Sequence, residues 1–414
     1  MKGNKIPYQT IFSVLVVYYW IISIGFGLLE EIERFSVAYF LTVLPIALFI
    51  ILCLPKISKI TNRITIPLWI FLLLVFIVSI VRLDIGTIIT FSLMILTIIA
   101  LVNYNLQVNL RLLNTLFISS IVLMVILFHF KISHYVIPHG YIPGQTKSLN
   151  DSWRVSMMPL LADSGMFSLL IFILNYCFNK KKRSRMFFLI LSFYFLVFTG
   201  IRSTLIIFMM FVLFVFISSK IQMKDRLFYR LYNWMVVVGF IFFMFFNSFL
   251  IVFAQKIDKP LFNKIILKQE NAVITQKGLN KTIFRTWIWE QHYKLFKRNP
   301  LMGIGTFDFS KEVIIPPDMP GGMTASETPL TGFFARVGIC SVFFILFFLQ
   351  LWIKGLILND KYKYFLPSLI FVSILSYGSY FVPYNFFFLI LFASWNGIYI
   401  QENRKTKSVL CRTD

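Results

Sequence analysis

Charged residues are scarce in this chain of 414 amino acids, and acidic residues are the scarcer kind. Only 14% of the residues are charged, and 17 Asp and Glu stand against 40 Lys and Arg. Soluble domains carry about a quarter charged residues, so this composition excludes an ordinary soluble protein. The basic excess does not indicate a nucleic-acid partner, because most Lys and Arg occur in short segments between apolar runs, as in membrane proteins.

Cysteine is also rare, and the four residues are widely separated: Cys53, Cys177, Cys340 and Cys411. None of them has the spacing of a metal-binding or redox pair, so we expect neither a disulfide nor a metal site. Three histidines, His129, His134 and His139, are five residues apart. That interval matches neither one helical face nor a common metal-ligand spacing.

What the chain has in abundance is apolar sequence, since 58% of the residues are hydrophobic and 18% are aromatic. About 20 apolar residues in a helix cross a hydrocarbon core of about 30 Å. We therefore predict an all-α polytopic membrane protein with about twelve transmembrane helices. The predicted spans are 9–28, 36–54, 65–82, 86–103, 112–130, 157–178, 186–200, 203–219, 233–254, 332–353, 364–382 and 384–400.

The distribution of Lys and Arg orients these spans with both termini in the cytoplasm of a multi-pass cell-membrane protein. Three regions follow. Residues 1–254 form a nine-helix membrane region. Residues 255–331 form one large extracytoplasmic loop that carries short amphipathic helices. Residues 332–414 contain the last membrane helices and a basic cytoplasmic tail.

The large loop contains the most informative stretch, residues 280–305. Asn280 can cap a helix, and Asn299-Pro300 must end it, because proline disfavours α conformation in the residue before it. Within it, Arg285, Trp289 and His292 share one helical face. His292 is a substrate-binding candidate, although a histidine in such a helix is more often a solvated surface residue.

Two arginines are candidates for binding a phosphate group. Arg202 falls in the predicted outer turn between the seventh and eighth spans, and Arg285 is flanked by Trp287 and Trp289. An arginine fork binds phosphate oxygens in pairs, and aromatic rings favour the faces of sugars. The alternative for Arg202 is an interfacial arginine that extends its head to water.

Two carboxylates are further candidates. Asp163 lies within the sixth span, where a charge is costly, and either contacts substrate or neutralises an arginine such as Arg154 or Arg202. Glu327 precedes a membrane helix, after a loop rich in proline and glycine, and could act as a general base. Its alternative is a solvated carboxylate at a helix N-terminus.

Three pieces of the chain together resemble the O-antigen ligase and O-antigen polymerase superfamily of bacterial surface-polysaccharide enzymes. TGIRSTLIIF is similar to that family's T-G-S-R opening of a membrane helix, with Ile201 in place of serine. RTWIWEQHYKLFKRNPLMGIGTFDF is close to its R-x-x-x-W…N-P-(apolar)-x-G-(apolar)-G pattern. ETPLTGFFARVGI aligns with the ligases' H-N-(nine residues)-G-x-x-G signature, with Glu327 at the histidine and Ser341 at the last glycine. Arg154 with Pro159 and Gly165 is a looser match.

The resemblance implies a membrane glycosyltransferase whose donor is a polyprenyl-diphosphate-linked oligosaccharide, with no cofactor and no metal. It implies catalytic roles for Glu327, Arg202 and Arg285, and membrane lipid, a flippase and a chain-length regulator as partners. A glutamate at position 327 fits the polymerase branch, for O-antigen or capsule. The rivals are a ligase that transfers the glycan to a final acceptor, and a transporter or flippase of lipid-linked sugars.

Overall fold

The computed structural model describes residues 8–28, 35–57, 65–129, 156–158, 161–199, 202–220, 291–305, 329–347, 350, 385–396 and 398–399. The N-terminal helices are α1 (Tyr8–Leu28), α2 (Phe35–Ile57), α3 (Ile66–Arg82), α4 (Ile85–Asn103) and α5 (Leu110–His129). They are followed by α6 (Leu161–Phe178), α7 (Lys182–Thr199), α8 (Arg202–Lys220), α13 (Pro329–Val337), the 3₁₀ turn η2 (Gly338–Cys340) and α16 (Phe386–Asn396). Residues 291–298 and 341–347 are also helical.

The first eight predicted spans each coincide with a helix to within a few residues. The largest differences are at the starts of the sixth and seventh spans, where α6 begins at Leu161 and α7 at Lys182. Residues 157–158 form a bend. The predicted spans 233–254 and 364–382 lie outside the described residues. The count of twelve therefore stays a prediction.

Two later spans differ from the prediction of continuous helices. The span 332–353 is interrupted by η2, because Gly338 has a φ of +66° and α13 cannot continue through it. The span 384–400 ends as a helix at Asn396, and Ile398–Tyr399 (β2) pair in parallel with Val108–Asn109 (β1). This two-residue pairing is a minor departure from an all-α fold.

The surface of the helices identifies an integral membrane protein. Among the described residues, three segments are long and apolar enough to cross a membrane: Tyr8–Gly25, Ile85–Asn103 and Leu110–Leu127. In addition, α7 exposes Phe187, Ile190 and Tyr194 at helical spacing, and α3 exposes Leu73 and Phe76. Exposed apolar faces of this extent are not those of a soluble monomer, so they are the surfaces that lipid would cover.

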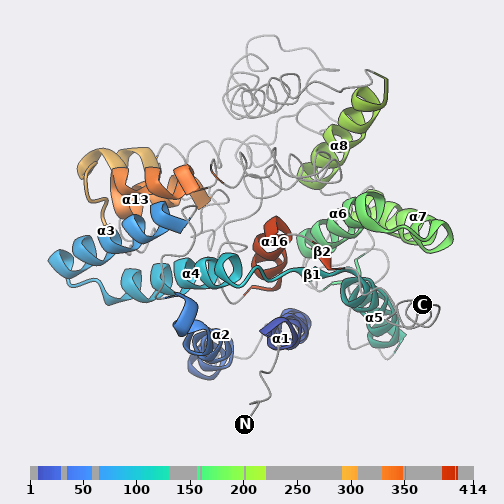
Figure 1. Ribbon diagram of the computed structural model, residues 1–414, viewed down its shortest axis with the longest axis horizontal. Coiled ribbons are helices and arrows are strands. Elements are labelled where there is room, and N and C mark those ends of the chain that lie inside the picture. The colour runs from blue at the N-terminus through green and yellow to red at the C-terminus, as the bar shows by residue number, and fades with distance from the viewer. Residues whose placement is uncertain are drawn as a thin grey trace, which may run out of the picture.

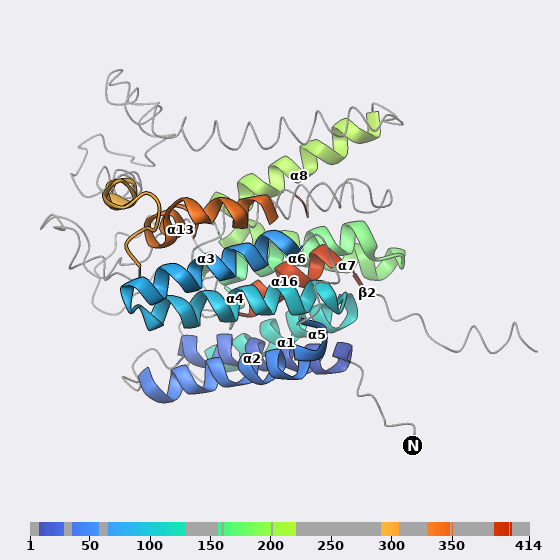
Figure 2. The same ribbon diagram turned by 60° about the vertical axis from the view of Figure 1, so that its left-hand side comes forward.

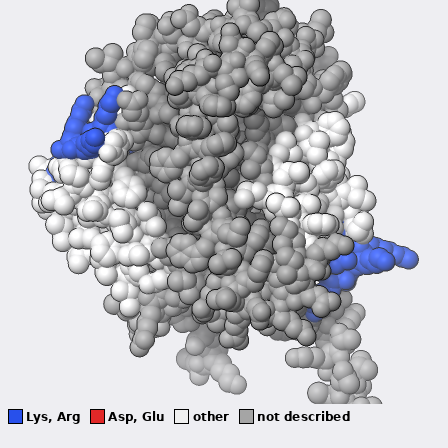
Figure 3. All heavy atoms as spheres, turned by 90° about the horizontal axis from the view of Figure 1, so that it is seen from above, with Lys and Arg blue, Asp and Glu red and all other residues white. Residues whose placement is uncertain are grey.

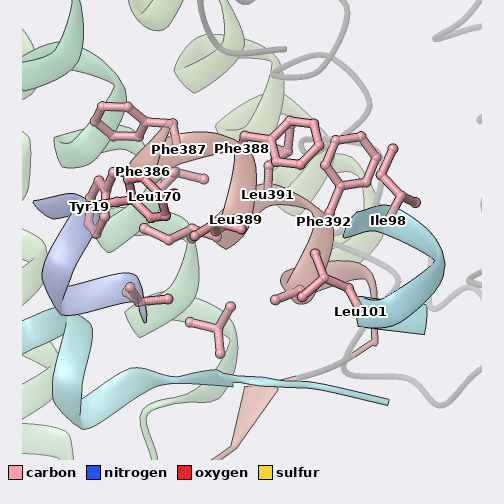
Figure 4. Packing of buried hydrophobic residues seen from close by; sticks show 14 of the residues in the cluster. Tyr19, Ile98, Leu101, Leu170, Phe386, Phe387, Phe388, Leu389, Leu391 and Phe392 are labelled. Atoms are coloured by element: carbon pink, nitrogen blue, oxygen red, sulfur yellow. The ribbon is translucent and has the colours of Figure 1, made fainter. Parts of the chain in front are cut away.

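The centre of the fold is α16, whose side chains from Phe386 to Ala393 are all buried. Figure 4 shows these rings and leucines meeting Tyr19 from α1, Ile98 and Leu101 from α4, and Leu170 from α6. A helix that is apolar all round and enclosed on every side is shielded from lipid by protein. The helices that carry the candidate site are therefore arranged around a rigid aromatic core.

The helices run roughly alongside one another, so the molecule has two ends (Figures 1 and 2). The α3–α4 turn, the 291–298 helix and α13 lie at the left in both views, whereas the α6–α7 turn lies toward the right. Among the described residues visible in Figure 3, Lys and Arg gather at two separate edges of the face. The topology predicted from the sequence puts the left-hand end outside the cell.

Two pairs of amide groups join segments of the helix bundle. The side-chain amides of Asn114 on α5 and Asn175 on α6 donate to each other's oxygens at 3.0 and 2.8 Å. On α1, the Gln9 amide donates to the Gln107 carbonyl at 2.6 Å and accepts from the Gln107 amide at 3.1 Å. Such paired amides hold apolar helices in register, because an unmatched polar group is costly there.

Candidate active site

Two of the sequence pieces that carry the resemblance are joined in space. Residues 299–305, from the second piece, pack on residues 335–340, from the third piece, and we call this unit the glycine junction. Its hydrogen bonds run from Ile304 N–H to the Ala335 carbonyl at 2.8 Å, from Gly305 N–H to the Arg336 carbonyl at 2.9 Å, and from Ile339 N–H to the Pro300 carbonyl at 2.8 Å. The thiol of Cys340 also lies 3.7 Å from the Leu301 carbonyl oxygen.

The sequence folds this way because of how the 291–298 helix ends. Asn299 accepts from the Gly303 amide through its carbonyl at 2.7 Å and from the Met302 amide through Oδ1 at 3.2 Å. Pro300 follows directly and cannot continue the helix. The prediction that Asn299-Pro300 ends the helix is confirmed, and the turn that results directs the next residues back onto α13.

Glycine is required at both sides of the junction. Gly303 and Gly338 have φ angles of +64° and +66°, in the left-handed region that side chains rarely adopt. A Cβ on Gly338 would lie 2.6 Å from both the Gly303 nitrogen and the Pro300 carbonyl oxygen. A Cβ on Gly303 would collide with the backbone of Arg336. Gly303 and Gly338 thus allow the backbone of residues 299–305 to contact the backbone of residues 335–340.

The 291–298 helix presents one buried face and one exposed face. His292 and Leu295 are 3% and 1% exposed, and the ring of Phe296 packs edge-on against Phe334 of α13 at 5.9 Å. The exposed face carries Lys297, whose ammonium group lies 4.5 Å from the centre of the Tyr293 ring. The helix is therefore held by α13 and turns its basic residues outward.

His292 is buried rather than solvated, in contrast to the usual surface histidine of an amphipathic helix. Burial, with a smaller contribution from the positive charge of Arg336, lowers the pKa of its imidazole to about 4. The ring is therefore neutral at physiological pH. The prediction that His292 contacts substrate stays a prediction, and the structure adds a packing role beside Arg336.

Two charged residues at the junction were not singled out from the sequence. Asp84, in the α3–α4 turn, interacts electrostatically with Arg336 of α13. Arg336 could have been found, because an arginine within the apolar run 332–353 meets the same criterion that selected Asp163. Asp84 gives no such signal, since an aspartate in a short turn is usually solvated.

The structure places two of the other predicted site residues. Arg202 is the first residue of α8, three positions after α7 ends at Thr199, so it lies where these two helices meet, and its placement on the outer side stays a prediction. Its side chain is not described. Asp163 lies in the first turn of α6 and is 9% exposed. The remaining candidates lie outside the described residues: Arg154, Arg285, Trp287, Trp289 and Glu327.

No group of three or more His, Cys, Asp or Glu within the described residues could hold a metal ion. Three cysteines, Cys53, Cys177 and Cys340, are free, and Cys411 lies outside the described residues. The side chains described at or beside the junction include those of Arg336, Asp84, His292 and Cys340.

Apolar helices with surfaces that lipid would cover are those of an integral membrane protein. The comparison with protein families is more specific. The family model described as O-antigen ligase matches residues 187–329, which include most of α7, all of α8 and residues 299–305 of the glycine junction. This match confirms the resemblance to the O-antigen ligase and polymerase superfamily. No curated protein and no solved structure matches the chain.

Proposed function

We propose that this protein is a surface-polysaccharide polymerase, acting on O-antigen or capsule. It transfers a glycan chain from a polyprenyl-diphosphate carrier onto a lipid-linked repeat unit at the outer face of the membrane. The family match supports a membrane glycosyltransferase of the ligase and polymerase type. The choice of polymerase within that type rests on Glu327, which occupies the position of the ligases' histidine in ETPLTGFFARVGI.

In the proposed reaction, Arg202 and Arg285 grip the diphosphate of the donor. The acceptor hydroxyl oxygen attacks the anomeric carbon, and the bond from that carbon to the phosphate oxygen breaks. The leaving polyprenyl diphosphate takes the electron pair, and the two guanidinium groups stabilise the charge that develops on it. Neither a metal ion nor a cofactor is needed for this step.

Glu327 removes the proton from the attacking hydroxyl, because a sugar hydroxyl is a weak nucleophile until a base takes its proton. Trp287 and Trp289 offer flat faces to sugar rings. Arg154, Asp163 and His292 complete the proposed substrate-binding set. Asp163 is buried in the first turn of a membrane helix, and a carboxylate in that position favours a specific partner.

The position of the glycine junction supports an enzyme over a transporter. Transporters of lipid-linked sugar are expected to place their sites near the middle of the membrane, between related halves. Here the 299–305 segment joins α13 at the same end of the molecule as the α3–α4 turn (Figure 2). A one-sided polar site of this kind suits a reaction at one membrane surface.

The experiment that tests the proposal is the glycan profile of a strain from which this protein is deleted. A polymerase is expected to leave a single repeat unit on the final acceptor and no ladder of longer chains. Accumulation of full-length polymer on its lipid carrier would instead establish a ligase. Repeat units trapped on the cytoplasmic side of the membrane would establish a flippase.

A further inference from the structure

The glycine junction is attached to the N-terminal half of the chain through Asp84. Its Oδ1 accepts the Thr87 amide at 3.1 Å and its Oδ2 accepts the Thr87 hydroxyl at 2.7 Å, so the carboxylate caps α4 and is held in one orientation. The same Oδ2 lies against Gly305, where a Cβ would come within 2.5 Å of it. Gly305 has a φ of +80° and leaves the space that this carboxylate occupies.

Arg336 interacts electrostatically with both Asp84 and His292. It lies in the last turn of α13, half-buried, between Ala335 and Val337, which are both fully buried. A cation among apolar helices is costly unless an opposite charge compensates it, and Asp84 supplies that charge. Asp84 and Arg336 therefore join the start of α4 to the end of α13. Neither has a part in the chemistry proposed above.

The consequence for the reaction comes from chain connectivity. The segment 306–328, which contains Glu327, begins directly after Gly305 and ends directly before Pro329. Gly305 donates its amide to the Arg336 carbonyl at 2.9 Å, and Pro329 opens the helix whose last turn carries Arg336. The eight residues from 329 to 336 span about 10 Å of helix. Both ends of the segment are thus attached to the same helix, and the end at Gly305 lies against Asp84.

We propose that Asp84 and Arg336 are positioning residues, which lock Gly305 and α13 together and so fix where Glu327 meets the acceptor hydroxyl. The catalytic consequence rests on the proposed function, whereas the lock itself does not. Charge is the essential property at both positions, because an uncompensated Arg336 would favour water over its place in the junction. A displacement of about 1 Å at a reacting group can cost about two orders of magnitude in rate.

The kinetic test compares variants that keep shape with variants that keep charge. Asp84→Asn keeps the shape and one acceptor oxygen for the Thr87 amide, with an NH2 group that can donate to the Thr87 hydroxyl, but it loses the charge. Arg336→Gln loses the charge of its partner. Both are expected to lower kcat by about tenfold or more, with little change in KM for the lipid-linked donor, because the proposed lock orients the base rather than binding the donor. Arg336→Lys keeps the charge and is expected to retain most of the activity. Lys297→Gln removes an exposed charge from the same region and should have no effect.

The structural test uses the thiol of Cys340, which lies in the junction 3.7 Å from the Leu301 carbonyl oxygen. With the other three cysteines replaced by serine, its rate of alkylation at fixed pH reports how often the junction opens. Asp84→Asn and Arg336→Gln are expected to raise this rate several-fold, and Lys297→Gln to leave it unchanged.

The alkylation rate of Cys340 tests the lock, and kcat tests its positioning role. Unchanged alkylation in Asp84→Asn would overturn the lock, and faster alkylation with normal kcat would overturn the positioning role. A fully active Glu327→Gln enzyme would refute the base assignment, yet the alkylation rates would still decide whether Asp84 and Arg336 form the lock.

Discussion

At the scale of single residues, the proposal depends most on Glu327. Glutamine at this position keeps the shape and hydrogen-bonding capacity of the side chain but cannot accept a proton. Glu327→Gln is therefore expected to reduce polymerisation by about two orders of magnitude or more, the usual effect of losing a general base. The measurement is polymer formed from purified lipid-linked repeat units. Glu312→Gln, in the same predicted loop, is the matched control, and near-normal turnover by well-inserted Glu327→Gln protein would remove Glu327 from the mechanism.

The two phosphate-binding arginines make a second prediction at this scale. Lysine preserves the charge of Arg202 and Arg285 but loses the planar fork that grips two phosphate oxygens. Both Arg202→Lys and Arg285→Lys are expected to lower the amount of polymer strongly at an unchanged protein level. Arg298→Lys makes the same chemical change on an exposed side chain of the 291–298 helix and should be neutral. Normal polymer from both site variants would refute the bidentate role.

At the scale of elements, the glycine junction depends on backbone contact. Alanine at Gly338 would add a Cβ 2.6 Å from the Gly303 nitrogen and would also occupy a left-handed conformation, which costs about 1–2 kcal/mol before any clash. Gly338→Ala is therefore expected to separate 299–305 from 335–340, which would appear as faster alkylation of Cys340 and reduced polymer. Gly25 of α1 has open space around its Cα, so Gly25→Ala is a control that should be harmless. Equal alkylation in both variants would contradict the packing described here.

His292 gives the junction a pH dependence whose sign follows from its pKa. The imidazole has a pKa of about 4 when folded and 6.5 when freely solvated, so the open state binds more protons between these values. The contribution of His292 to stability is thus complete above about pH 6.5 and is lost as the pH falls toward 4. Hydrogen exchange of the Gly303, Ile304 and Gly305 amides, corrected for the intrinsic rate, should accelerate from pH 6.5 to 5. His292→Gln does not titrate, and an identical pH response in that variant would refute the assignment.

The helices and their ends show how much of the fold could be predicted from the sequence. Apolar runs of about 20 residues place α1 to α8 to within a few residues, because crossing a membrane fixes both length and composition. The break at Gly338 was not predicted, since an apolar run reads the same whether or not its helix is interrupted. Asn299-Pro300 predicted the end of a helix, but the hydrogen bond from Ile339 to the Pro300 carbonyl is tertiary and leaves no local pattern. Asp84 was missed for the same reason, because its partner lies 252 positions further along the chain (336 − 84).

At the scale of the whole molecule, the core explains why a polar junction can be rigid at the membrane surface. The enclosed helix α16 packs against α1 and α4, and α4 begins at Asp84, which contacts the junction. The ring of Phe71 on α3 stacks against Phe344, six residues after Gly338, with centres 5.7 Å apart. Apolar packing between α3 and residue 344 and the interaction of Asp84 with Arg336 thus hold the same helices together.

The last prediction concerns the orientation of this assembly in the membrane. Lys and Arg are concentrated in the segments assigned to the cytoplasm, including the exposed residues Lys180 to Arg183 in the α6–α7 turn and at the start of α7. Because the glycine junction lies at the opposite end of the bundle, residues 255–331 are expected to be outside the cell (Figure 1). In a cysteine-free background, Glu270→Cys should react with a membrane-impermeant thiol reagent in intact cells, and Lys181→Cys only after lysis. Outer-membrane permeabilisation is included where the cell has one, so that the inner membrane is the barrier tested. Labelling of Glu270→Cys only after lysis would reverse the topology and would separate the proposed site from a substrate presented at the outer face.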